Sequence, residues 1–207
     1  MTMRTFKTLS LTLGLAFTGF VWADVTKAKA TELGVHRTER LVTLGRIDPS
    51  FLTHIYSMSI ENALDVADGA KFVVKNRQYQ APATNQNILT MRQDLNGRTL
   101  SHTVDLGDID PTAPVWPDKD AATLVESALH YVIENGPTNA EVAPFDADLT
   151  SLTLIQSTGS DSQVRAVVDF HSSTTARVLR ATLKADATIE STQLSKKLPF
   201  SDFSREP

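Results

Sequence analysis

The fold is decided by residues 118–136, which read DKDAATLVESALHYVIENG. Apolar side chains recur there at spacings of three and four, so at about 3.6 residues per turn they form one stripe along a helix: Leu124, Val125, Ala128, Leu129, Val132 and Ile133. Asp118 and Asp120 suit the start of this helix, and Gly136 followed by Pro137 ends it. Burial stabilises each large side chain by about 1.5–3 kcal/mol, so we expect a sheet to cover the stripe.

Strand patterns lie on both sides of this helix. From Ile55 the period changes to two, which places Tyr56, Met58 and Ile60 on one face of a half-buried strand. Asn96-Gly97 is a strong hairpin signal. Eight strands are predicted, near residues 55–61, 71–79, 87–95, 98–106, 149–156, 163–170, 176–184 and 188–194.

A second, weaker helix pattern precedes the first strand. Its apolar positions run from Leu33 to Ile47, are interrupted by Gly34 and stop at Asp48-Pro49. We expect residues 24–30 before it to be loosely held, and residues 137–147 after the main helix to be irregular. The segment 107–117, GDIDPTAPVWP, contains three prolines and is predicted to be an extended linker. The predicted organisation is therefore a first unit at 24–106, the linker, a second unit at 118–195 and a tail at 196–207, which either docks an aromatic side chain or is frayed.

The two units can be superimposed in sequence. A shift of 94 residues places Phe51 on Phe145 and also Val73 on Val167, whereas near the hairpins a shift of 89 places Thr99 on Thr188. Two segments that share one offset favour internal duplication, although any two amphipathic strands can be aligned in this way. The predicted fold class is α+β, as two tandem repeats that each pack one helix on a four-stranded antiparallel sheet.

The first 23 residues are typical of a secretory signal peptide. Arg4 and Lys7 lead into an apolar run that ends before Ala23, and this run is shorter than the roughly 20 residues of a membrane span. We expect cleavage after Ala23 and a periplasmic or secreted protein without a membrane span; the alternative is an uncleaved anchor.

Charge and cysteine content exclude several functions. Cleavage would remove two positive charges and change the formal net charge from −4 to −6, which disfavours nucleic acid as a partner. The sequence has no cysteine, so neither disulfides nor thiolate chemistry can contribute. An exported chain of this kind depends on its core for stability.

The order of helix and strands, closed by DLNGRTLSHTV at 94–104, resembles exported bacterial PepSY-like and cystatin-like domains. It is also similar to the tandem architecture of the β-lactamase inhibitory proteins. The resemblance covers most of the chain after residue 23 as an order of elements, and its local match is the hairpin Leu95–Arg98. It implies a helix laid across a bent antiparallel sheet. The QxVxG hairpin of cystatins and the cysteines of the secreted inhibitors are absent, so neither inhibitory activity is assigned to particular residues.

Candidate binding residues lie on the two helices and in the linker. His36 and Glu39 are three residues apart, and His130 and Glu134 are four apart, so each pair shares one helix face. A metal site needs further ligands, and the HExxH spacing is absent, so we predict solvated pairs and no metal. Trp116 either anchors a partner or fills the junction between the units, and the second interpretation is favoured.

No catalytic constellation or cofactor motif is present, and the GxSxG elbow of serine hydrolases is missing. The sequence therefore predicts an exported, non-enzymatic binding protein, an inhibitor, adaptor or assembly factor, whose partner is another protein or an envelope component. The alternative is a small-ligand binder or hydrolase that uses the cleft between the repeats, with His36, Glu39 and His130 as its polar groups.

Overall fold

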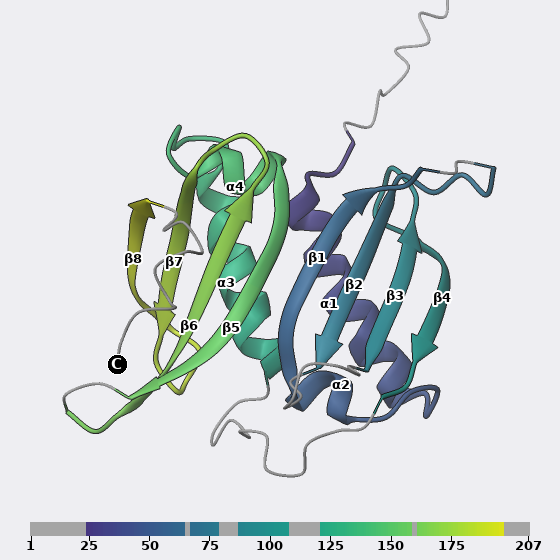
Figure 1. The fold of residues 1–207 in the computed structure, drawn as a ribbon, viewed down its shortest axis with the longest axis horizontal. Helices are drawn as coiled ribbons and strands as arrows, with labels where there is room; N and C mark the ends of the chain where they lie inside the picture. Colours follow the sequence, from purple (N-terminus) through teal and green to yellow (C-terminus); the bar gives the residue numbers. More distant parts are fainter. Residues whose placement is uncertain (1–23, 65–66, 79–86, 108–120, 159–160, 197–207) are drawn as a thin grey trace, which may run out of the picture.

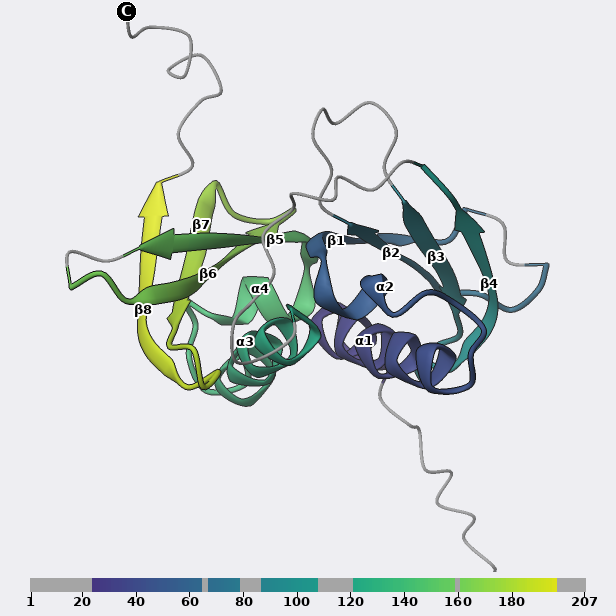
Figure 2. The ribbon, with the colours of Figure 1, turned by 90° about the horizontal axis from the view of Figure 1, so that it is seen from below.

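The computed structural model describes residues 24–64, 67–78, 87–107, 121–158 and 161–196. It is an α+β fold with one eight-stranded antiparallel sheet, and the helices cover one face of that sheet (Figures 1 and 2). Within the described residues, no helix has both the length and the apolar character needed to cross a membrane.

All eight predicted strands are present. The N-terminal elements are α1 (Lys27–Thr43), α2 (Ser50–Thr53), β1 (Ile55–Asn62), β2 (Phe72–Gln78), β3 (Ile88–Gln93) and β4 (Thr99–Asp105). The C-terminal elements are α3 (Ala121–Asn135), α4 (Ala143–Ala147), β5 (Leu149–Thr158), β6 (Val164–Ser172), β7 (Arg177–Leu183) and β8 (Ile189–Lys196).

The strands form one sheet in the order β4-β3-β2-β1-β5-β6-β7-β8. Antiparallel pairing of β1 with β5 joins the two groups of four through Met58 opposite Leu152. The structure therefore combines in one sheet the strands that the sequence analysis assigned to two. Of the described strands, β4 and β8 form the two edges of this sheet (Figure 1).

A β-bulge near the start of β1 makes the predicted face of Tyr56 wrong. The register shifts between Ile55 and Ser57, so Ile55 is buried while Tyr56 is 36% exposed, contrary to the expected side of Tyr56. One extra residue moves every preceding side chain to the opposite face. The same irregularity occurs in β5 between Leu149 and Ser151, 94 residues later.

The hairpin at Asn96-Gly97 is present, but its loop has three residues. The Asp94 amide donates to the Arg98 carbonyl, and Gly97 has the left-handed φ of 73° that closes such a loop. The β7–β8 hairpin repeats these bonds between Lys184 and Thr188, with Ala187 at φ 67°. The two hairpins are thus related by a shift of 90, not the predicted 89.

The predicted limits of the first helix are wrong at both ends. Helix α1 begins at Lys27, where the Thr26 hydroxyl accepts a hydrogen bond from the Lys29 amide, and Ala28 and Ala30 are fully buried. It ends at Thr43 instead of continuing to Ile47. Gly34 does not interrupt it: a Cβ there would lie 3.1 Å from Cγ1 of Val74, so glycine lets the helix approach the sheet.

The main helix, α3, buries its predicted stripe against the sheet. Leu124, Val125, Ala128, Leu129 and Val132 are at most 2% exposed, and Ile133 is half-buried. The stretch after it, predicted to be irregular, contains α4. The predicted signal peptide at residues 1–23 lies outside the described residues, as do residues 108–120, which include most of the predicted linker with Trp116, Asp118 and Asp120, and residues 197–207.

Candidate functional site

Two histidines and two glutamates form reciprocal contacts where α1 lies beside α3. His36 on α1 places Nε2 3.4 Å from Oε1 of Glu126 on α3. His130 on α3 places Nδ1 3.6 Å from Oε1 of Glu32 on α1. Both histidines and both glutamates are separated by the same 94 residues. We call these four side chains the helix seam.

One further glutamate on each helix, Glu39 on α1 and Glu134 on α3, contacts the histidine of the same helix. His36 Nδ1 lies 3.5 Å from Glu39 Oε2, and His130 Nε2 lies 2.9 Å from Glu134 Oε1. These are the pairs predicted from helical spacing, and the structure brings them together. Glu32 and Glu126 were not predicted from helical spacing, because they meet the histidines across the two helices. The 94-residue offset between the two histidines could have identified them, because the same offset separates Glu32 from Glu126.

The two sides of the helix seam differ in burial and in charge. The Glu32 side chain is only 4% exposed and forms an ion pair with Lys29, whereas Glu126 is 34% exposed. His36 and His130 are 44% and 60% exposed. Contacts at such exposure contribute little to stability, typically below about 1 kcal/mol each. The histidine and glutamate side chains of the helix seam are therefore better placed to bind a ligand at the surface than to stabilise the fold.

One subset of these residues has the composition of a metal site. His36, Glu39 and Glu126 can each direct one ligand atom so that the three atoms lie within 4.8 Å of one another. No other such group of three occurs among the residues that the structure describes. The structure thereby supplies a third ligand that helical spacing alone did not provide.

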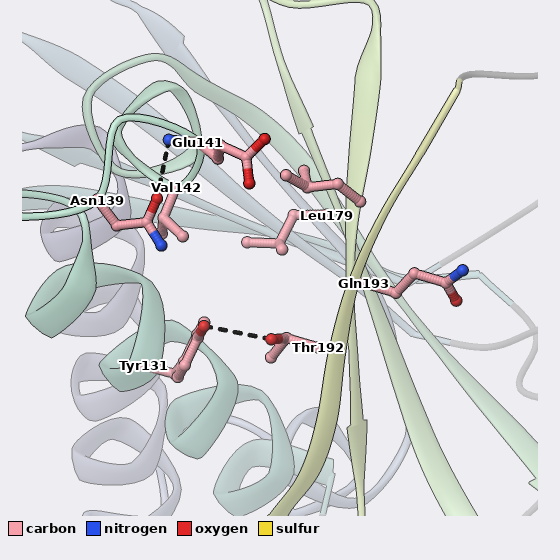
Figure 3. A pocket seen from close by; sticks show the side chains of 8 residues that line it. Tyr131, Asn139, Glu141, Val142, Leu179, Thr192 and Gln193 are labelled. Atoms are coloured by element: carbon pink, nitrogen blue, oxygen red, sulfur yellow. Dashed lines mark hydrogen bonds between the residues drawn. The ribbon is translucent and has the colours of Figure 1, made fainter.

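Two clefts lie apart from the helix seam, each beside an edge strand. The first, of about 370 Å³, lies between the α1–α2 loop and β4 and is lined by Gly45, Arg46, Ile47, Asp48, Phe51, Val104 and Leu106. The second, of about 160 Å³, lies between α3, the α3–α4 loop and β8 and is lined by Tyr131, Asn139, Glu141, Val142, Leu179, Thr192, Gln193 and Leu194 (Figure 3).

The clefts occupy corresponding places in the two halves. Gly45 and Asn139 are 94 residues apart, and Val104 and Leu194 are 90 apart, the same offsets that relate the bulges and the hairpins. The loop that follows the long helix therefore meets the edge strand in a similar way twice.

The chemistry of the two clefts differs. Tyr131 and Thr192 face each other across the second cleft, with their hydroxyl oxygens 3.3 Å apart, and the Asn139 side chain accepts a hydrogen bond from the Glu141 amide (Figure 3). The first cleft presents mainly apolar atoms, with Arg46 and Asp48 as its charged residues. Its Leu106 is 75% exposed and lies at the rim of the cleft.

Comparisons of the chain with known protein families and with curated proteins give no match. The functional interpretation therefore depends on the residues and their geometry.

Ion pairs connect β6 with β7, with β8 and with the loop before β6. Arg180 donates two hydrogen bonds of 2.7 Å to the carboxylate of Asp169. Arg165 contacts both Asp161 and Glu190 and holds the pKa of each carboxyl below its usual range. Because Asp161 and Glu190 are both paired with the Arg165 guanidinium, their lowered pKa values indicate structural ion pairs and not a catalytic acid.

Asp146 on α4 is a buried carboxyl with a different environment. Burial raises its pKa, and a hydrogen bond with the Thr26 side chain opposes that effect in part. Its Oδ1 has no hydrogen-bond partner among the described residues. It lies against Gly136, where an added Cβ would come within 2.6 Å of the Asp146 Cβ. Asp146 therefore connects the start of α1 with the end of α3.

Proposed function

We propose that this protein is an exported, non-enzymatic binding protein of the bacterial envelope or the secreted fraction, and that it holds an extended segment of another polypeptide beside β4. The observation that carries the proposal is the apolar cleft at this edge. Among the described strands, β4 pairs with β3 on one side only, which leaves its outer backbone groups to pair with a further strand.

The apolar cleft supplies the side-chain contacts that such a strand needs. Phe51 forms its buried floor, with Ile47 and Val104 half-buried beside it and Leu106 at the exposed rim. Apolar anchors seated in pockets contribute much of the binding energy of protein interfaces. Main-chain hydrogen bonds along β4 would supply affinity, and the cleft would select apolar side chains of the partner.

We propose further that the chain consists of two tandem repeats, each one long helix and four strands. The repeated bulge, the repeated three-residue loop and the reciprocal His–Glu contacts support this idea. It is consistent with the resemblance to PepSY-like and cystatin-like domains, and with the tandem plan of the β-lactamase inhibitory proteins. The signal-like residues 1–23 support export, with cleavage after Ala23.

Comparative capture from an envelope extract tests the binding function. We expect the wild type to retain a specific protein and Leu106→Asp to lose it, because a carboxylate at the rim opposes entry of an apolar side chain. The matched control is Leu64→Asp, since Leu64 is fully exposed but does not line the cleft. Equal capture by wild type and Leu106→Asp, or turnover of a small substrate in the absence of any partner, would contradict the proposal.

A hydrolase or small-ligand binder that acts between the two halves is the second candidate, and the contacts of His36 and His130 with carboxylates across the adjoining helices α1 and α3 favour it, with Glu39 beside His36. In that case His36→Ala and His130→Ala would abolish activity while the melting temperature stayed unchanged. Loss of folding in these variants would instead assign the histidines a structural role.

A further inference from the structure

We propose that His36, Glu39 and Glu126 bind a divalent transition-metal ion, with Zn²⁺ as the best match, and that the ion bridges α1 and α3. This site lies apart from the apolar cleft and goes beyond the proposed binding function. It also differs from the prediction of no metal site, which considered only ligands on a single helix.

The donor set fits zinc. Imidazole nitrogen and carboxylate oxygen bind Zn²⁺ at about 2.0–2.2 Å, so ligand atoms at neighbouring corners of a tetrahedron are separated by roughly 3.3–3.6 Å. Nδ1 of His36 lies 3.5 Å from Glu39 and Nε2 lies 3.4 Å from Glu126, and one ligand atom from each of the three side chains can be chosen so that all lie within 4.8 Å of one another. Small rotations of the exposed side chains would bring one ring nitrogen and both carboxylates to a common ion, and the other ring nitrogen would stay free to form a hydrogen bond.

The backbone holds the ligands in place. His36 and Glu39 are separated by one turn of α1, and Val35 beside them is fully buried. Glu126 follows the fully buried Val125 of α3, so both helices are fixed against the sheet. The partial exposure of the three side chains gives the ion a path to the site and leaves the fourth position for water.

The corresponding side chains on the opposite half provide an internal control. His130 also meets two carboxylates, and Glu134 and Glu32 approach different ring nitrogens, as the two carboxylates do at His36. Among the described residues, however, only the His36 group offers three ligand atoms within 4.8 Å of one another. Glu32 is nearly buried and already neutralised by Lys29. A cation there would compete with the lysine ammonium, so we expect zinc at His36 and not at His130.

Calorimetric titration of the purified, untagged protein with ZnCl₂ tests the site. We expect one ion per chain, and an affinity at least about tenfold weaker in His36→Ala and in Glu126→Gln, since each loses a direct ligand. The affinity of His130→Ala should match the wild type. Zinc should raise the melting temperature of the wild type and of His130→Ala but not of His36→Ala.

Titration with Co²⁺ gives a second readout, because the visible absorption of Co²⁺ reports its coordination geometry. We expect the absorption of tetrahedral Co²⁺ in the wild type and its loss in Glu126→Gln, with circular dichroism confirming that each variant is folded. The proposal is overturned if the wild type binds no zinc, if His36→Ala and Glu126→Gln bind it as well as the wild type, or if His130→Ala loses it equally.

Discussion

Individual residues determine how closely the elements of this fold approach one another. Gly97 closes the β3–β4 hairpin at a left-handed φ and lies against Leu33 of α1. Gly34 allows α1 to approach Val74, and the corresponding position in α3 is the small residue Ala128. The turn role of Gly97 was readable in the sequence, but its contact with Leu33 was not, because it joins segments far apart in the chain.

Replacing Gly97 with alanine should destabilise the protein by about 2–3 kcal/mol, of which roughly 1 kcal/mol is the cost of the left-handed backbone. The remainder arises because the new Cβ would lie 2.4 Å from Cδ1 of Leu33. Urea denaturation measures the change. Gly45→Ala is the control, since Gly45 has φ 64° and no atom within 4 Å of an added Cβ. If the two variants lose equal stability, the Leu33 contact has no effect.

Asp146→Asn should stabilise the protein near neutral pH. Burial raises the pKa of this carboxyl above its ordinary 3.8, so the folded state disfavours the ionised form. The stability contributed by protonated Asp146 is complete below the unfolded-state pKa and is lost as pH rises through the folded-state pKa. The advantage of the asparagine variant should therefore shrink on acidification, as measured by thermal melts from about pH 7 to about pH 3. An advantage independent of pH would contradict this reasoning.

Whole helices and strands were the features best predicted from the sequence. The stripe of α3 and the alternation of the strands are local periodic patterns, and local periodicity fixes which face is buried. The first turns of α1 were missed because Lys27–Ala30 contains only alanine and lysine and so lacks large apolar side chains. The side of Tyr56 was predicted incorrectly because a bulge depends on the partner strand and not on the strand alone.

Leu129→Asp should cost several kcal/mol of unfolding free energy, since Leu129 is fully buried in the stripe of α3 and a carboxylate there would have no partner. Urea denaturation again gives the value. Glu134→Ala, on the exposed face of the same helix, should change stability by less than about 0.5 kcal/mol. An unchanged unfolding curve for Leu129→Asp would contradict the assigned face of the helix.

At the scale of the whole molecule, the pairing of β1 with β5 combines the two halves in one sheet over a shared core (Figures 1 and 2). The sequence predicted the order of the elements but not this junction, because pairing between distant strands has no local signature. The residues of the candidate site likewise divide into those that local spacing predicts and those that depend on packing between distant segments. His36, Glu39 and His130 were predicted from helical spacing, Glu126 and Glu32 required the packing of α1 on α3, and Trp116 lies outside the described residues.

A continuous sheet and one core should unfold as one unit. We expect a single cooperative transition, with circular dichroism and calorimetry giving the same midpoint. Two separable transitions would mean that the halves are independent domains despite the β1–β5 pairing.

Amide hydrogen exchange of the protein, alone and with the captured partner, tests the proposed function most directly. Because a bound strand would cover the outer edge of β4, we predict slower exchange in Thr99–Asp105 and in residues 45–48, and no change in β8. Protection confined to β8 or to the outer surfaces of α1 and α3, or no protection at all, would contradict binding at the β4 edge.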